Sequence, residues 1–345
     1  MEPVYERIEK TRKGSATARY CRIMSRSRGG EPMAIKLIEA ERLYRDTPQV
    51  AYTIKNFLDT PFESSPVARD FYELWRERSL IGRLKDKFQL AIPQKPILVE
   101  PVDAPESVWI SEGAMMPVSN FKPFSEDILQ VKKNGVIAII PEALTMLDGM
   151  NVDVIVSNNL VNQCVQAIDK HFLSAAPETD AQPAGILCGA PSVTLSGGTK
   201  AELVSTFEAM AGKLESWKSP VWITNPPSFA RLAALGLIDF SSGRDRLLGT
   251  EIFQSTSCPC KIVLADLNGI FLADDGRTHI DTSGVADIAY MDGEDRKIIN
   301  LFQSGYVGYR ILRYINWHVA RENSVIQCDF SQSSKPEPPV DPEGE

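Results

Sequence analysis

Residues 107–144 combine apolar and polar positions in a pattern that predicts two extended arms. β-Branched and aromatic side chains occur there at strand density, in VWISEGAMM, DILQVKKN and GVIAIIPEAL, and Gly113, Pro117 and Pro123 separate the arms. The arms have no packed core of their own. Such a ribbon must pack against something else, so the pattern favours a subunit that is completed in an assembly.

The next stretch changes to helical spacing. It predicts one long amphipathic helix from an N-cap at Asn151 or Asp153 to Ala175, before Pro177. Its apolar face holds Val154, Val161, Val165, Ile168 and Phe172, and its opposite face carries amides, Asn158, Asn159, Asn162, Gln163 and Gln166. An amide-rich second face suits a helix that lies between other elements.

Residues 1–58 predict three helical pieces, interrupted by glycines and by Pro48. In the second piece Ile35, Ile38 and Leu43 form one narrow apolar stripe among charges. The pattern predicts a small helical extension with a solvated face. The alternative is a temporary helical module that associates with copies of itself.

Residues 60–105 predict a short helix over 68–78, followed by extended pieces with four prolines (Pro93, Pro96, Pro101 and Pro105). Proline lacks a backbone donor and keeps the preceding residue extended, so this region is predicted to be an arm running over a surface. Arms of this kind often contact a neighbouring subunit.

Residues 182–330 alternate helices and strands and then run through successive strands, as in a mixed α+β domain. Helices are predicted over 200–217 and from Pro226, and the acidic Gly-containing stretches 274–276 and 292–295 are predicted turns. Residues 300–321 show a period of two, and both helix and strand remain open for them. Residues 331–345 are proline-rich and polar and are predicted to be disordered.

Composition narrows the class of protein. The 345 residues suffice for two domains, with 43% hydrophobic and 24% charged residues. The net charge of −8 argues against gripping nucleic acid through a basic surface, although residues 1–30 hold eight basic and three acidic side chains. Six scattered cysteines and the absence of a spanning or secretory segment predict a soluble, reduced protein without export.

Catalytic and metal-binding motifs are not found. The sequence has no phosphate-binding glycine loop, no zinc-protease helix motif and no nucleophile elbow, and Cys258-Pro259-Cys260 has the spacing of a turn. The three histidines (His171, His279 and His318) fall in separate elements and are predicted to be packed or surface residues. No catalytic residue, cofactor or metal is predicted, and the chain is not expected to be an enzyme. Lys132, Lys133, Arg310 and Arg313 are open to contact with phosphate, with a partner subunit or with solvent.

Four runs carry a resemblance to a known family: WISEGAMMPVSNFKPFSEDILQVKKNGVIAIIPEAL, NLVNQCVQAIDKHFL, QPAGIL and NLFQSGYVGYRILRYINWHVAR. In this order they resemble the major capsid proteins of tailed phages. These have the Hong Kong 97-type fold, which gene transfer agents and encapsulins share. The resemblance spans roughly residues 62–330.

The resemblance implies an α+β Hong Kong 97-type capsid fold divided as follows: a scaffold-like helical extension (1–58), an N-terminal arm (59–106), an extended loop lying over a neighbour (107–144), a peripheral domain with the spine helix (145–181 and 281–322), an axial domain (182–280 and 323–330) and a disordered tail (331–345). Residues 300–321 would be the strand beneath the spine helix. Proteolysis of the extension, with a cut between about 56 and 65, is the expected processing event.

The implied function is self-assembly of hexamers and pentamers into an icosahedral head that encloses double-stranded DNA without sequence specificity. Expected partners are further copies, a portal, a prohead protease and decoration proteins, with no membrane. Synthesis is expected in the host cytoplasm and residence in the virion capsid. The expected assembly contacts are Trp109, Glu112, Lys122, Phe124, Glu126, Lys132, Arg310 and Arg313.

Some relatives crosslink their subunits through a loop lysine and a distant asparagine, helped by a glutamate. Glu126, Gly305 and Leu312 stand at those places here, so no self-crosslinking is predicted, although Lys122 lies close to the lysine position. Two other functions stay open at this point: an encapsulin-like cargo compartment with a groove for a docking peptide, and a soluble α+β enzyme. Co-purified cargo would indicate the former, and elution as a small oligomer the latter.

Overall fold

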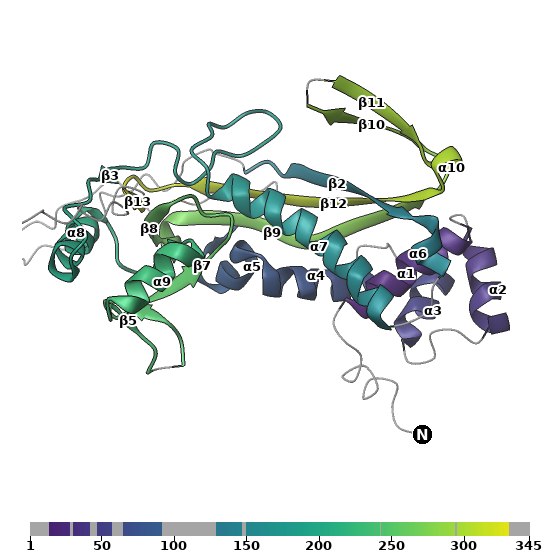
Figure 1. Cartoon of the computed structure of the whole chain (residues 1–345), viewed down its shortest axis with the longest axis horizontal. Helices are drawn as coiled ribbons and strands as arrows, with labels where there is room; N and C mark the ends of the chain where they lie inside the picture. Colours follow the sequence, from purple (N-terminus) through teal and green to yellow (C-terminus); the bar gives the residue numbers. More distant parts are fainter. Residues whose placement is uncertain are drawn as a thin grey trace, which may run out of the picture.

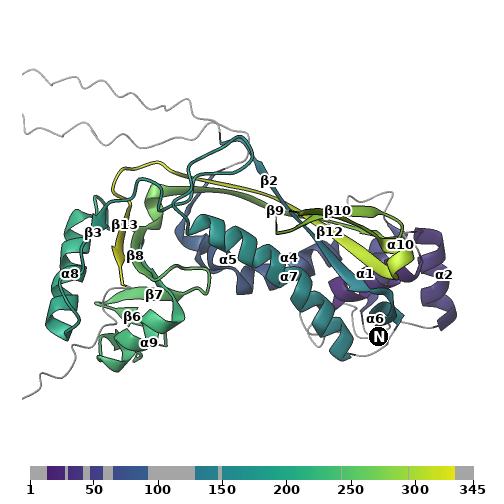
Figure 2. The same ribbon diagram turned by 45° about the horizontal axis from the view of Figure 1, so that its top comes forward.

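The computed structural model describes residues 14–27, 30–41, 47–56, 65–91, 129–146, 150–241, 243–293 and 295–330. The subunit is elongated, with two β-sheets along its length and a two-stranded hairpin that stands away from the body (Figure 1). A second view shows a row of helices running beneath the longest strands (Figure 2).

The sheet of long strands has the order β1-β9-β12-β2, with β1 (Gln89–Leu90), β9 (Ile270–Ser283), β12 (Tyr306–Val319) and β2 (Lys132–Pro141). β12 is antiparallel to both β9 and β2. The period of two in residues 300–321 therefore reflects a strand. Val307, Tyr309 and Ile311 are buried on one face of β12, while Arg310 between them is exposed. Only residues 301–304 of this run are helical, as α10 (Leu301–Ser304).

The spine helix predicted from the spacing is present as α7 (Met150–Phe172). From residue 158 onward most of its buried side chains are apolar, with Leu160, Val161, Ile168 and Phe172 almost fully covered, and Asp169 is buried among them. The amide face contacts α4 (Pro66–Arg78), because Arg78 donates to Asn158 and, at 2.9 Å, to Asn162. Both helices pack on the long-strand sheet, α7 against β2 and α4 against β9, so α7 has a packing partner on each of its two faces, as its sequence predicts.

Residues 14–56 form α1 (Ser15–Arg26), α2 (Glu31–Glu41) and α3 (Pro48–Lys55). The prediction of a solvated extension is wrong for α1: nine of its twelve residues are buried, against α4, α7 and α6 (Glu142–Met146). Even Arg22 is 1% exposed. The stripe expected on α2 is present in Ile35 and Ile38, whereas Leu43 lies outside the described residues.

The described part of the arm, residues 65–91, is largely helical and belongs to the same core. The helix expected at 68–78 is α4, and the residues directly after it are helical too, since they form α5 (Leu80–Leu84) and the 3₁₀ turn η3 (Lys85–Lys87). The four prolines expected in extended chain, at positions 93–105, lie outside the described residues. Leu80, Ile81 and Leu84 are fully buried. Asp169 of α7 fixes the corner between α4 and α5, because it accepts from Ser79 Oγ and from the backbone N–H of Leu80, both at 2.7 Å.

The second sheet has the order β3-β13-β8-β4-β7-β6-β5. Its strands are β3 (Ser192–Val193), β4 (Pro220–Thr224), β5 (Ile238–Asp239), β6 (Arg246–Leu247), β7 (Thr250–Gln254), β8 (Lys261–Asp266) and β13 (Val325–Asp329). One face packs on α8 (Lys200–Lys213) and α9 (Pro226–Ala234), whose Phe207 and Leu232 meet Trp222. The other face joins the core of the long-strand sheet through Val221, Ile223 and Val263.

One predicted turn is wrong and the other is confirmed. The chain does not reverse at Asp274-Asp275-Gly276, because β9 continues through it and only the pairing with β12 shifts, between Arg313 and Ile315. β9 follows η4 (Leu267–Gly269) directly. The stretch 292–295 is the turn of the hairpin β10 (Asp287–Asp292) and β11 (Asp295–Asn300), where Asp292 pairs with Asp295.

The long strands also cross two of the expected domain limits. β2 pairs along all its ten residues with β12 of the same chain, so the second part of the expected loop belongs to the long-strand sheet of its own subunit. The expected border at residue 280 falls inside β9. Residues 92–128 and 331–345, which hold most of the expected loop and the tail, lie outside the described residues.

Candidate assembly surfaces

The face of the long-strand sheet that points away from α7 is a mixed apolar and charged surface. Along β2 the even-numbered Ala138 and Ile140 are buried, whereas the odd-numbered Ile137 and Ile139 are 47% and 36% exposed. Arg310 of β12 pairs in register with Ile137. β2 is also an edge strand of its sheet, so within the described chain one row of its backbone donors and acceptors has no neighbouring strand. Such an edge favours pairing with another chain.

The β10–β11 hairpin stands away from the body beside α10 (Figure 1). Its exposed apolar side chains include Met291 and Ile298, which are 64% and 67% exposed, and Phe302 of α10 is 68% exposed. A two-stranded hairpin is marginally stable by itself in water. Its apolar surface therefore indicates a packing partner outside the subunit.

A hollow of about 390 Å³ separates the base of this hairpin from the sheet. It is lined by Ile137 of β2, Ile288 of β10, Leu301 of α10 and the Asp281–Arg310 pair. The hollow joins the hairpin and the open sheet face into one continuous surface.

A third exposed apolar site lies at the opposite end, near β5, β6 and β7. Phe240 is 57% exposed, and Leu248 in the β6–β7 turn is 47% exposed. Leu248 has a φ of 50°, a left-handed conformation that costs a non-glycine residue about 1–2 kcal/mol. An exposed leucine in this conformation does not add to the stability of the isolated subunit.

The expected contact residues differ in how available they are at the surface of the subunit. Arg310 is 54% exposed and its Nε donates to Asp281 at 2.8 Å, so it stays available at the surface. Lys132 instead gives its three N–H groups to Glu178, to the carbonyl of Thr179 and to the carbonyl of Gln182 within the subunit. Trp109, Glu112, Lys122, Phe124 and Glu126 lie outside the described residues.

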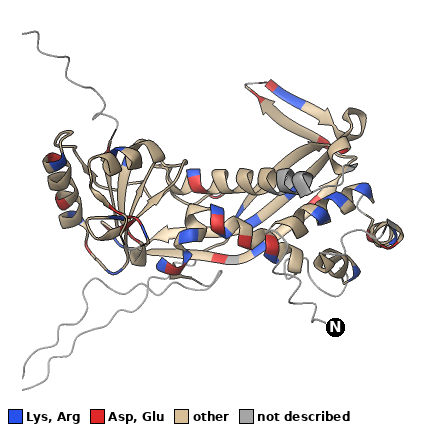
Figure 3. Cartoon of the chain, turned by 60° about the horizontal axis from the view of Figure 1, so that its bottom comes forward, with Lys and Arg blue, Asp and Glu red and all other residues tan. Residues whose placement is uncertain are grey.

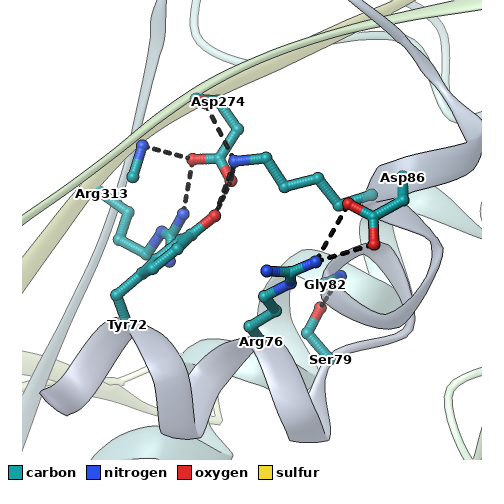
Figure 4. A network of polar contacts seen from close by, with 9 residues as sticks. Tyr72, Arg76, Ser79, Gly82, Asp86, Asp274 and Arg313 are labelled. Atoms are coloured by element: carbon teal, nitrogen blue, oxygen red, sulfur yellow. Dashed lines mark hydrogen bonds and ion pairs between the residues drawn. The ribbon is translucent and has the colours of Figure 1, made fainter. Parts of the chain in front are cut away.

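Arg313 is not a surface contact, because its side chain is completely buried. Its Nη2 donates to Asp274 at 2.7 Å (Figure 4). Its guanidinium also lies 3.7 Å from the ring centre of Trp75. An arginine in a period-two strand is usually assigned to the solvated face, so the burial of Arg313 was not predicted. A signal was present in the numbering, because Arg313 shares the odd-numbered, buried face of Val307 and Ile311.

Asp274 is the centre of this buried cluster. Lys85 Nζ reaches its carboxylate at 3.2 Å and also donates to Tyr72 Oη at 2.6 Å. Burial by itself raises the pKa of Asp274, but Arg313 and Lys85 together hold that pKa below its ordinary value. Asp274 remains ionised and ties α4, η3, β9 and β12 together.

Nothing in the described part of the chain resembles a catalytic or metal centre. No cluster of three metal-ligating side chains occurs there. His171 lies against Trp317 and the carbonyl of Pro183, and His279 pairs with Asp281. Lysine, arginine and acidic side chains are interspersed over the ribbon (Figure 3). Among the described helices none is both long and apolar enough to cross a bilayer.

The described part of the subunit is elongated (Figure 1) and carries open apolar surfaces at both ends, which suits a protein that packs against further copies. The profile of the phage capsid family matches residues 65–330. The chain therefore belongs to the phage capsid family.

One curated relative and two solved structures illustrate what this chain is similar to. The capsid polyprotein of Pseudomonas phage PAJU2 is 24% identical over 290 residues, which cover 76% of this chain and 43% of the polyprotein. The chain thus spans less than half of that relative. The capsid of a native GTA particle has a similar fold at 12% identity, with a TM-score of 0.50 over 72% of this chain and 89% of that one. A Mycobacterium phage Bobi chain has a TM-score of 0.48 at 13% identity, covering 71% and 89%. The predicted Hong Kong 97-type fold is confirmed.

Proposed function

We propose that this chain is the major capsid protein of a tailed phage and forms hexamers and pentamers that close into an icosahedral head around double-stranded DNA. The observation that carries the proposal is the continuous open surface of the β10–β11 hairpin and the outer face of β2 and β12. Its apolar side chains are covered by no described part of the subunit, so they support burial against a neighbouring copy.

The segment 107–128 of a neighbouring copy is the proposed occupant of the open sheet face. Trp109, Phe124 and the methionines between them would meet Ile137 and Ile139, and Glu112 or Glu126 would meet Arg310. Apolar contacts with a charged pair at the margin match the usual anatomy of stable interfaces.

In this proposal the shell encloses the DNA without binding it through a basic surface. The net charge of −8 and the interspersed charges of Figure 3 support this, because an electrostatic grip needs a basic field. A portal, a prohead protease and decoration proteins are the further proposed partners. We place synthesis in the host cytoplasm and assign the chain no catalytic activity.

The test is assembly of the purified full chain, followed by size-exclusion chromatography and negative-stain microscopy. We expect megadalton particles or capsomers from the wild type and loss of both in Ile298→Asp, with an unchanged circular dichroism spectrum. Met33→Ser is the matched control, since Met33 is an exposed apolar residue on α2, away from the hairpin. Wild-type protein that stays monomeric at high concentration would overturn the proposal.

A further inference from the structure

The N-terminal helical segment, residues 14–56, lies outside the match to the phage capsid family, which starts at residue 65. Its helices nonetheless contact the matched part closely. α1 touches α4, α6 and α7, and α3 touches α4 (Figures 1 and 2). A releasable extension would share little buried surface with the subunit, so these contacts decide what the segment does.

The N-terminus of α1 is capped by a side chain of another helix, α4. Its N-cap is Gly14, which has no side chain to accept from the first backbone N–H groups. Asp70 of α4 takes that role across 56 residues: its carboxylate accepts from Gly14 N at 2.8 Å and from Thr17 N at 3.2 Å. Burial raises the pKa of Asp70, and the bonds from Gly14 and Thr17 act against this rise. Without Asp70, α1 has no described cap, and without α1, Asp70 is a buried carboxylate without these donors.

The middle and end of α1 are bonded to the core as well. Arg22, almost completely buried, points its Nε at the carbonyl of Thr145, which belongs to α6. Ser25 Oγ lies 2.7 Å from Tyr309 Oη, near the start of β12. Polar groups of α1 thus have partners in the interior, and withdrawing the helix would leave those partners unpaired in an apolar environment.

The apolar contacts have the same distribution. Ala18, Cys21 and Ile23 of α1 and Val50 of α3 are fully buried, in the same core cluster as Trp75 and Tyr309. α1 therefore fills a site between α4, α6, α7 and the sheet. It is the kind of internal helix on which a subunit depends, and its basic residues are not displayed to acidic surfaces elsewhere.

We propose that residues 14–56 are a permanent clamp of the shell subunit, seated between α4, α6, α7 and β12, and that they stay bound even when the chain is cut between residues 56 and 65. The inference rests on the proposed capsid function for its setting. It differs from the expected scaffold in that processing does not remove the segment from the shell.

The experiment uses the full chain with a site-specific protease sequence inserted between residues 56 and 65. After cleavage of the purified protein in native buffer, size-exclusion chromatography and mass spectrometry measure the N-terminal fragment. We expect it to co-elute with the rest of the chain at a one-to-one ratio. Elution of the fragment by itself from otherwise folded protein would overturn the clamp.

Asp70→Ala in the same cleavable chain tests the cap directly. We expect the fragment to dissociate about tenfold faster, because losing a helix cap typically costs about that factor. Asp86→Ala is the matched control, since Asp86 is an exposed carboxylate that pairs with Arg76 and is predicted to leave dissociation unchanged. Equal and measurable dissociation of the Asp70 and Asp86 variants would overturn the assignment of Asp70 as the cap that holds the clamp.

Intact-mass analysis of shells made in the presence of the phage's own protease gives a second readout. Shell proteins whose residues 14–56 are present, attached or as a bound fragment, support the clamp, and shells without them overturn it. Particle formation is scored separately by microscopy. Absence of particles contradicts the proposed capsid function, whereas loss of the fragment contradicts only the clamp.

Discussion

Replacing Asp274 by asparagine removes the charge at the centre of the buried cluster and leaves its shape almost unchanged. Arg313 then keeps its stacking on Trp75 but loses its carboxylate partner. Its Nε and Nη1 have no hydrogen-bond partner among the described residues, so Nη2 makes the hydrogen bond to the acid. The variant leaves a guanidinium that is 0% exposed beside a neutral amide.

The expected loss in the free energy of unfolding follows from the burial of this ion pair. Breaking a buried ion pair by removing one partner costs about 3–5 kcal/mol, because the remaining charge is uncompensated. We expect the lower end, about 3 kcal/mol, since the cation–π contact with Trp75 persists in the variant. That loss is a large share of the free energy of unfolding of a typical protein, which is roughly 5–15 kcal/mol.

The chain offers a matched control on the same two strands. Asp281 of β9 pairs with Arg310 of β12, as Asp274 of β9 pairs with Arg313 of β12, but the Asp281 pair is 38% and 54% exposed. Asp281→Asn should therefore cost less than about 1 kcal/mol. The two variants differ mainly in burial, which isolates the effect.

The assay is urea unfolding of the unassembled subunit, followed by tryptophan fluorescence at two protein concentrations to show that assembly does not contribute. With a slope of about 3 kcal/mol/M, the Asp274 variant should unfold at a urea concentration about 1 M lower. The double replacement Asp274→Leu with Arg313→Met should recover most of that loss, because an apolar pair leaves no buried charge. If Asp274→Asn unfolds within 0.2 M of Asp281→Asn, as an order-of-magnitude criterion, the reasoning about burial is refuted.

Four further predictions follow from other features. Because the pKa of Asp274 is lowered in the folded state, its contribution is complete above the unfolded pKa of about 3.9 and is lost as the pH falls through the folded value; the gap between wild type and Asp274→Asn should shrink below about pH 4, and a gap independent of pH would contradict this. Gly82→Ala should destabilise the subunit by about 1–3 kcal/mol in urea unfolding, since its Cβ would lie 2.6 Å from the backbone of Arg76; an unchanged midpoint would show that the α4–α5 corner relaxes freely. Leu248→Gly should stabilise the unassembled subunit by about 1 kcal/mol because the turn needs a positive φ, while shell formation should weaken; a less stable subunit would contradict the strain argument. Assembled shells should give a single monomer band on a boiled denaturing gel, and a covalent ladder would show crosslinking through Lys122.

The sequence predicted the elements that depend on one clear period. The spacing of Val161, Ile168 and Phe172 located the spine helix, and the Asp-Gly chemistry at 292–295 located the hairpin turn. For residues 300–321 the period of two left helix and strand open, and the family resemblance indicated the strand. β12 has a buried face because α1, α4 and α7 cover it, which no local pattern contains.

The failures share one physical cause, the pairing of charges across distant parts of the chain. Asp274 was predicted to lie in a turn because its ion-pair partner, Arg313, is 39 positions away and does not contribute to the local pattern. The basic residues of α1 read as a wet face, although Arg22 is buried beside a carbonyl 123 positions away. The exposed surfaces were missed for a related reason: Ile298 and Met291 look like core residues until the fold shows that nothing covers them.

The bond between Ser25 and Tyr309 joins positions 284 residues apart, and it has a consequence for the order of folding. At roughly 5–20 residues per second, a ribosome needs about 15 to 60 seconds between making these two residues. α1 leaves the ribosome long before β12, yet its site is complete only after β12 has been made. A helix made early therefore finishes its packing late, and a chain that stops before β12 leaves α1 without its complete site.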